Sequence, residues 1–147
     1  MVNISASGNN YIKIIIASIS LIIGGLIYVV FRSESLIMFS WFDKFGLSES
    51  ISVLREILGN KTIYSWLNYN MPAALWLFAY MYVIDAIWNN FDNAILYKPF
   101  FWLMPIIAIL SEFLQLLHLM PGTFDILDLL SYLFSVIIYF SLNKINP

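Results

Sequence analysis

The sequence predicts an all-α integral membrane protein, a bundle of four transmembrane helices with one amphipathic interfacial helix in the first loop. Three observations predict this fold. Of the 147 residues, 61% are hydrophobic and only 11% are charged, whereas soluble domains carry about 25% charged residues. Four long apolar segments follow one another, and a polar loop separates the first from the second. No linker or internal repeat divides the chain, so we expect one domain over residues 1–147.

The first predicted span runs from Ile14 to Phe31. These 18 residues contain no charge, and as an α-helix they would cover roughly 27 Å, enough to cross the hydrocarbon core. The sequence Phe31-Arg32-Ser33 at the end of this segment is not a signal-peptide cleavage site, so we expect an uncleaved anchor. Ser20 and Gly24 form a small-xxx-small pair, which would allow another helix to approach closely.

The loop over residues 33–65 holds four of the nine acidic and three of the seven basic residues. Within it, Ser48–Leu58 has the pattern of an amphipathic helix, because Ile51, Leu54 and Leu58 fall on one face. We expect this helix to lie along the membrane surface.

Three further spans are predicted after this loop. Pro72 and Pro99 suit the first turn of a helix, where a missing N–H costs little, whereas Pro105 lies inside the third span and should kink it. A short turn at residues 120–122 makes the third and fourth spans antiparallel neighbours. The predicted ranges are Pro72–Trp88, Pro99–Leu119 and Phe124–Leu142, and Thr123 is the expected N-cap of the last.

Four spans place both termini on one side of the membrane. The Lys and Arg residues divide almost evenly between the two sides, so the positive-inside rule gives little orientation. We expect both termini to be cytoplasmic.

The composition and the motifs exclude several function classes. Seven basic against nine acidic residues leave no basic excess for binding nucleic acid. Without Cys there can be no disulfide, thiolate metal site or Cys nucleophile. The sequence also lacks a nucleophile elbow, a phosphate-binding glycine loop and a paired zinc motif. We therefore expect no metal and no cofactor, and we favour a protein that is not an enzyme. The partner that the composition indicates is the lipid bilayer.

Polar side chains gather at one end of the hairpin formed by the third and fourth predicted spans. Glu112 and Asp128 are each eight residues from Met120 in the turn, and Gln115 and Asp125 are each five residues from it. Residues at equal distances from the turn lie at matched depths on antiparallel helices, so we expect a ladder of polar pairs. Intramembrane carboxylates usually face a partner or a water-filled cavity. The candidate ligand-binding residues are Glu112, Gln115, His118, Thr123, Asp125 and Asp128.

Three interpretations of this ladder remain open. Its side chains could hydrogen-bond to one another and cap the fourth helix, bind a ligand or substrate, or form a proton or cation path. Three carboxylates in a low dielectric cannot all be comfortably ionised without a base, and the hairpin contains no Lys or Arg. We expect a protonated carboxyl, a bound cation, or a base from the first loop such as Arg55 or Lys61.

Asp85 is a second intramembrane acid, near the far end of the second predicted span. We expect it to pair with Lys98, with Tyr97 or with the Asn89–Asn90 segment.

The hairpin turn resembles the signature of VanZ-like membrane proteins. The resemblance lies in Glu-x-x-Gln at residues 112–115 and Pro-Gly-Thr-Phe-Asp-x-x-Asp at residues 121–128. The segment Met-Pro-Ala-Ala-Leu-Trp at residues 71–76 is similar to the second span of a short subgroup of that family, and the similarity covers about 64–142. Thr123 stands where many members carry Arg, and Ala73 replaces an Asp, so the local cation of the family pattern is missing here.

The resemblance implies a polytopic protein of the cell envelope in a bacterial plasma membrane. The family's namesake is linked to low-level teicoplanin resistance, so the implied ligand is a lipid-linked envelope precursor or a glycopeptide. Two alternatives remain. One is a membrane enzyme on a lipid-linked substrate with Glu112 and Asp128 as acid and base, and the other is a structural accessory subunit of a membrane complex.

Overall fold

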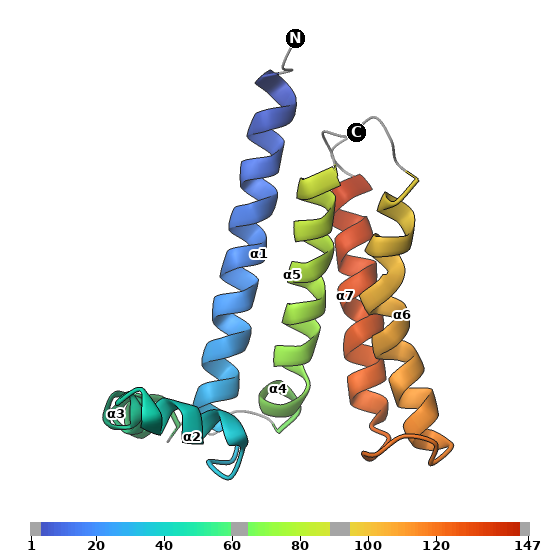
Figure 1. Cartoon of the computed structure of the whole chain (residues 1–147). Helices are drawn as coiled ribbons and strands as arrows, with labels where there is room; N and C mark the ends of the chain where they lie inside the picture. The colour runs from blue at the N-terminus through green and yellow to red at the C-terminus, as the bar shows by residue number, and fades with distance from the viewer. Residues whose placement is uncertain (1–3, 60–64, 89–94, 145–147) are drawn as a thin grey trace.

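The computed structural model describes residues 4–59, 65–88 and 95–144, which form seven helices and no strand (Figure 1). Four helices, α1, α5, α6 and α7, are long and apolar enough to cross a membrane. The predicted all-α fold with four spans is confirmed, and the chain is an integral membrane protein. The helices are α1 (Ile4–Phe31), α2 (Ile37–Lys44), α3 (Ser48–Gly59), α4 (Ser65–Tyr69), α5 (Met71–Trp88), α6 (Tyr97–Leu116) and α7 (Ile126–Lys144).

Helix α5 is the central span. It packs along α1 on one side and against both α6 and α7 on the other. The start of α1 and the end of α7 lie at the same end of the bundle, while α2 and α3 lie crosswise at the opposite end (Figure 1). We refer to these as the terminal end and the loop end.

The buried core of the bundle is small. It is centred on α5, where Ala79 and Met81 are fully buried, and on aromatic residues of α6 and α7, where Phe101 and Tyr139 pack together. Many large apolar side chains of the spans are exposed, for example Ile22 at 62%. Such a surface is unfavourable in water, and the lipid bilayer covers it.

Two amphipathic helices, rather than the one expected, lie at the loop end. Helix α3 matches the predicted segment, whereas α2 was not predicted because its apolar pattern extends over only eight residues. Their apolar side chains Ile37, Trp41 and Ile57 are exposed. Both helices therefore present an apolar face that suits the membrane interface.

The predicted small-residue pair of α1 forms a close helix contact. Ser20 is buried and its hydroxyl donates to the carbonyl of Ile16 at 2.9 Å. At Gly24 an added Cβ atom would lie 2.7 Å from Nε1 of Trp76 and 3.3 Å from the carbonyl oxygen of Pro72. Only glycine lets α1 and α5 approach this closely.

A polar cluster of four residues joins the spans near the terminal end. Nζ of Lys13 lies 2.8 Å from Oδ2 of Asp85, which also accepts a hydrogen bond from the hydroxyl of Tyr139 at 2.6 Å. The hydroxyl of Tyr97 donates to the other oxygen of Asp85 at 3.4 Å. This terminal-end cluster links one residue from each of the four spans.

The partners expected for Asp85 are partly corrected by this cluster. Tyr97 is a partner as expected, but Lys98 is exposed and the cation comes from Lys13 instead. Lys13 reaches Asp85 because α1 is helical from Ile4, ten residues before the expected start of the first span. The Asn89–Asn90 segment lies outside the described residues.

Gly24→Ala is expected to destabilise the protein by about 1–3 kcal/mol, because the added methyl group would overpack the α1–α5 contact. The measurement is the free energy of unfolding of the purified chain in detergent. Gly25→Ala is the matched control, since no heavy atom lies within 4 Å of a Cβ at that position. Equal stability of the two variants would contradict the close contact.

Asp85→Asn is expected to cost about 3–5 kcal/mol of stability, because it leaves the buried ammonium of Lys13 without its counter-ion. The double variant with Lys13→Met should recover much of this loss. Unfolding in detergent measures both variants, and Glu49→Gln on the exposed face of α3 is the control. A double variant less stable than Asp85→Asn would argue against the ion pair.

Candidate functional site

Four polar residues converge at the loop end of the bundle: Asn70, Glu112, Asp125 and Asp128. The side-chain amide of Asn70 donates to Oδ1 of Asp128 at 2.8 Å and to Oδ2 of Asp125 at 3.3 Å. Oε2 of Glu112 accepts the backbone N–H of Asp125 at 3.1 Å. Asn70 and Glu112 are buried, whereas Asp125 and Asp128 are partly exposed. This loop-end cluster therefore opens towards the membrane boundary.

The end of α6 determines where Glu112 lies. The helix ends at Leu116, three residues before the expected end, because His118 takes a left-handed conformation with φ 56°. The N–H of His118 bonds to the carbonyl of Gln115 at 3.0 Å, and the N–H of Leu119 bonds to that of Leu114 at 2.9 Å. This pair of bonds is a Schellman motif, which closes the C-terminus of a helix.

The start of α7 places the two aspartates. Oδ1 of Asp125 accepts the N–H of Leu127 at 2.8 Å, so Asp125 is the N-cap of the helix. The expected N-cap, Thr123, is therefore wrong, and α7 begins at Ile126 rather than at Phe124. The reason is that a carboxylate next to the helix N-terminus is both a good acceptor and favoured by the helix dipole.

The other predicted site residues lie around the turn. Gln115 packs over Gly122, where an added Cβ would lie 2.6 Å from its Nε2 and where φ is 128°. Glycine at this position therefore meets both a steric and a backbone requirement. The side chains of His118 and Thr123 are exposed. The structure thus brings three of the six candidates into the cluster, and ligand binding by the six stays a prediction.

The loop-end cluster is acidic without a matching cation. Among the described residues, no Lys, Arg or His lies within salt-bridge distance of Glu112, Asp125 or Asp128. Arg55, one of the bases expected to reach them, pairs with Glu34 instead. Lys61, the other, lies outside the described residues.

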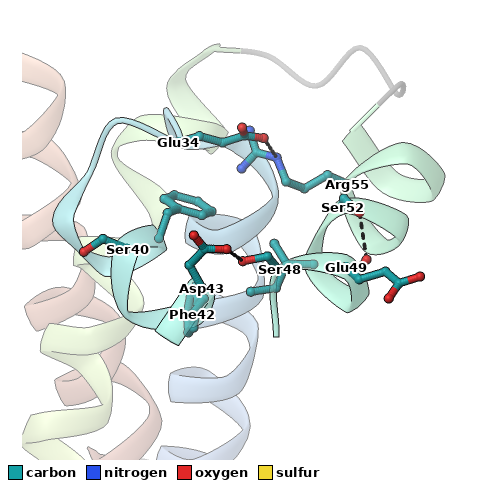
Figure 2. Close-up of a pocket in the computed structure, with 10 residues that line it drawn as sticks. Glu34, Ser40, Phe42, Asp43, Ser48, Glu49, Ser52 and Arg55 are labelled. Atoms are coloured by element: carbon teal, nitrogen blue, oxygen red, sulfur yellow. Dashed lines mark hydrogen bonds and ion pairs between the residues drawn. The ribbon is translucent and has the colours of Figure 1, made fainter. Parts of the chain in front are cut away.

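Arg55 joins α3 to the end of α1. Its Nε lies 3.3 Å from Oε1 of Glu34 (Figure 2). Its Nη1 donates to the carbonyls of Val29 at 2.7 Å and Arg32 at 2.9 Å. These are carbonyls at the C-terminus of α1, which otherwise lack a partner within the helix. The expectation that Arg55 neutralises the carboxylates of the hairpin is therefore wrong.

A cavity of about 570 Å³ lies between α2 and α3, next to Arg55 (Figure 2). Its acidic residues include Glu34, which pairs with Arg55, and Asp43, whose Oδ1 accepts the hydroxyl of Ser48 at 2.7 Å. Most of the lining side chains are solvent-exposed. The cavity fits a shallow space between two interfacial helices better than a built ligand site.

Two residues missed by the sequence analysis complete the loop-end cluster or border it. Asn70, between α4 and α5, is 2% exposed and connects both aspartates. A polar amide directly before an apolar span was the signal that could have indicated it. Arg32 follows α1, and its Nη2 donates to the carbonyl of Tyr69, the neighbour of Asn70, at 3.1 Å.

An apolar groove of about 530 Å³ runs along α7 from the level of the cluster. Ser131, one turn after Asp128, lines it and is 3% exposed, and its hydroxyl finds no hydrogen-bond partner within the described part of the chain. Phe134 belongs both to this groove and to a smaller one between α5 and α7. The lining residues of the larger groove are Leu127, Leu130, Ser131, Leu133, Phe134 and Ile137.

No protein family model matches the chain, and no curated protein or solved structure matches it. The resemblance to VanZ-like proteins is neither supported nor contradicted, and it stays a prediction. The function is therefore inferred from the loop-end cluster and its surroundings.

The bonds of Asn70 predict energetic coupling across the cluster. In a double-mutant cycle, Asn70→Ala and Asp128→Ala should show an interaction energy of about 0.5–3 kcal/mol, because the two side chains share a hydrogen bond. The free energy of unfolding in detergent is the measurement. Asn70→Ala combined with Asp43→Ala, a distant loop acid, should be additive. Additivity in the first pair would show that the amide and the carboxylate do not interact.

Proposed function

We propose that this protein binds a lipid-linked ligand at the loop-end cluster, with the headgroup on the carboxylates and a hydrocarbon chain in the groove along α7. One observation carries the proposal. Three carboxylates converge without a described cation beside a lipid-facing apolar groove that holds a buried, unpartnered hydroxyl. The buried polar atoms of the four cluster residues have hydrogen-bond partners, so the uncompensated negative charge and the hydroxyl of Ser131 are what favour a ligand.

The chemistry of the cluster selects the kind of headgroup. Ionised carboxylates only accept hydrogen bonds, so they favour ligands rich in hydroxyl or amine donors. The partly exposed Asp125 and Asp128 are the accessible acceptors, and Glu112 lies behind them and holds the backbone of Asp125. A sugar, a polyol or an amine on a lipid would meet these requirements.

The family resemblance gives a biological setting for this ligand. We propose a VanZ-like protein in a bacterial plasma membrane, with both termini in the cytoplasm and the loop end at the outer face. Lipid-linked envelope precursors, and glycopeptides that act on them, are accessible from that face. Gln115, His118 and Thr123 lie around the turn next to the cluster and would contact the outer part of such a ligand.

Binding fits this geometry better than catalysis. Ser131, one turn after Asp128, is a buried hydroxyl beside the groove, and no base hydrogen-bonds to it among the described residues. A serine nucleophile needs such a base within hydrogen-bond distance.

Lipid retention tests the proposal directly. The full chain, purified in nanodiscs with a glycosylated diacylglycerol, is compared by native mass spectrometry with the variants Asp125→Asn and Asp128→Asn. Each variant should retain about tenfold less glycolipid, because an amide replaces a charged acceptor. Glu49→Gln, an exposed acid of α3, is the matched control and should retain as much as the wild type. Unchanged retention in both aspartate variants would refute the proposal.

A further inference from the structure

Arg32 is held in a defined position at the loop end of α1. Its guanidinium carbon lies 5.3 Å from the ring centre of Tyr28 and 5.1 Å from that of Tyr69. Its Nη2 donates to the carbonyl of Tyr69 at 3.1 Å in an exposed position, while its Nε is buried. The partly exposed side chain is therefore fixed by two aromatic rings and one exposed hydrogen bond.

The charge of Arg32 has no acidic partner in the described part of the chain. Neither ion pair in that part includes it, whereas Arg55 on the neighbouring helix pairs with Glu34. Arg32 also follows directly on the first candidate span, which ends at Phe31. A cation at that depth lies where the phosphates of lipids are found.

The backbone of Tyr69 and Asn70 connects Arg32 to the loop-end cluster. It binds the carbonyl of Tyr69, and the next residue, Asn70, binds Asp125 and Asp128 with its side chain. A partly exposed guanidinium and two partly exposed carboxylates therefore border the same part of the loop end. Their opposite charges would suit two different parts of one headgroup.

We propose that Arg32 binds a phosphate of the same lipid whose headgroup donors lie on Asp125 and Asp128. This inference rests on the proposed function and narrows the ligand to a class. The class is a lipid whose phosphate, or diphosphate, is joined to a hydroxyl- or amine-bearing group. Arginine suits phosphate because several N–H donors lie in one plane, and the partly exposed guanidinium would supply those that Tyr69 does not occupy.

The alternative is that Arg32 is an ordinary interfacial arginine, which would contact the phosphate of any lipid equally well. The two accounts differ in whether the phosphate and the donors are recognised together. A joint site should prefer a lipid that has both features over lipids that have only one.

Three lipids with matched acyl chains separate these features. Phosphatidylglycerol carries a phosphate and headgroup hydroxyls, phosphatidic acid carries a phosphate without them, and monoglucosyl diacylglycerol carries hydroxyls without a phosphate. The full chain is purified in detergent with equal amounts of all three, and native mass spectrometry measures the bound fractions. Arg32→Gln tests the phosphate, Asp128→Asn tests the hydroxyls, and Lys44→Gln is the control for an exposed cation at the same end.

The wild type should prefer phosphatidylglycerol over each of the other two lipids by about tenfold, the value of one good charge-assisted hydrogen bond. Arg32→Gln should lose the preference over the glucolipid and keep the preference over phosphatidic acid. Asp128→Asn should show the reverse pattern. Arg32→Lys keeps the positive charge and serves as a second variant in case Arg32→Gln does not fold. It should lose only part of the preference for phosphatidylglycerol over the glucolipid. The Lys44→Gln control should behave as the wild type.

Each failure has its own meaning. If Arg32→Gln and Arg32→Lys keep the full preference for phosphatidylglycerol over the glucolipid, the proposed binding of phosphate by Arg32 is overturned. Glucolipid binding that depends on Asp128 would in that case still support the proposed function. If Asp128→Asn changes nothing, the proposed function fails as well. Added inorganic phosphate should not displace phosphatidylglycerol, because the hydrocarbon chain contributes to binding. Displacement would show a site for free phosphate and overturn the lipid assignment.

Discussion

The arrangement of this bundle depends on the cost of placing charged and polar groups at membrane depth, where each must find a partner inside the protein. Helix α5 has a polar side chain at or next to each of its ends, and each of these side chains is hydrogen-bonded to other helices. Asp85 near its C-terminus binds Lys13, Tyr97 and Tyr139 from the other three spans, and Asn70 immediately before its N-terminus binds the aspartates that open α7. The central position of α5 and its contacts with every other span follow from these two connections.

The two clusters obey the same constraint in different ways. In the terminal-end cluster an ammonium and two hydroxyls surround one carboxylate, so donors and acceptors are balanced and the group can be closed. In the loop-end cluster one amide and two backbone N–H groups serve three carboxylates, and no described cation joins them. This excess of acceptors at one end of the bundle, beside a groove in the lipid-facing surface, is the physical reason for assigning the ligand to the loop end.

Hydropathy and span length were sufficient to predict the four spans, and the helical spacing of Ile51, Leu54 and Leu58 predicted α3, because these properties depend on local sequence alone. Helix boundaries were less accurate where a side chain decided them: Asp125 rather than Thr123 caps α7, and His118 ends α6 early. Counting residues from the turn brought Glu112, Asp125 and Asp128 to one place, but the contacts differ from the expected pairs. Glu112 bonds to the backbone of Asp125 rather than meeting Asp128, and Gln115 packs over Gly122 rather than against Asp125. The count placed residues by depth alone. It could not find Asn70 or exclude Arg55, since their partners are set by how α1, α3 and α4 meet the hairpin.

A ligand that touches both Arg32 and the two aspartates would also change how the helices are joined. Helix α1 reaches the other spans mainly through α5, and Arg32 extends this connection only to the carbonyl of Tyr69. A headgroup between the guanidinium and Asp128 would link the end of α1 to the start of α7. Because it would bind only when these ends are in place, it would stabilise the folded bundle by mass action. Recognition of the lipid and closure of the loop end would then be a single event.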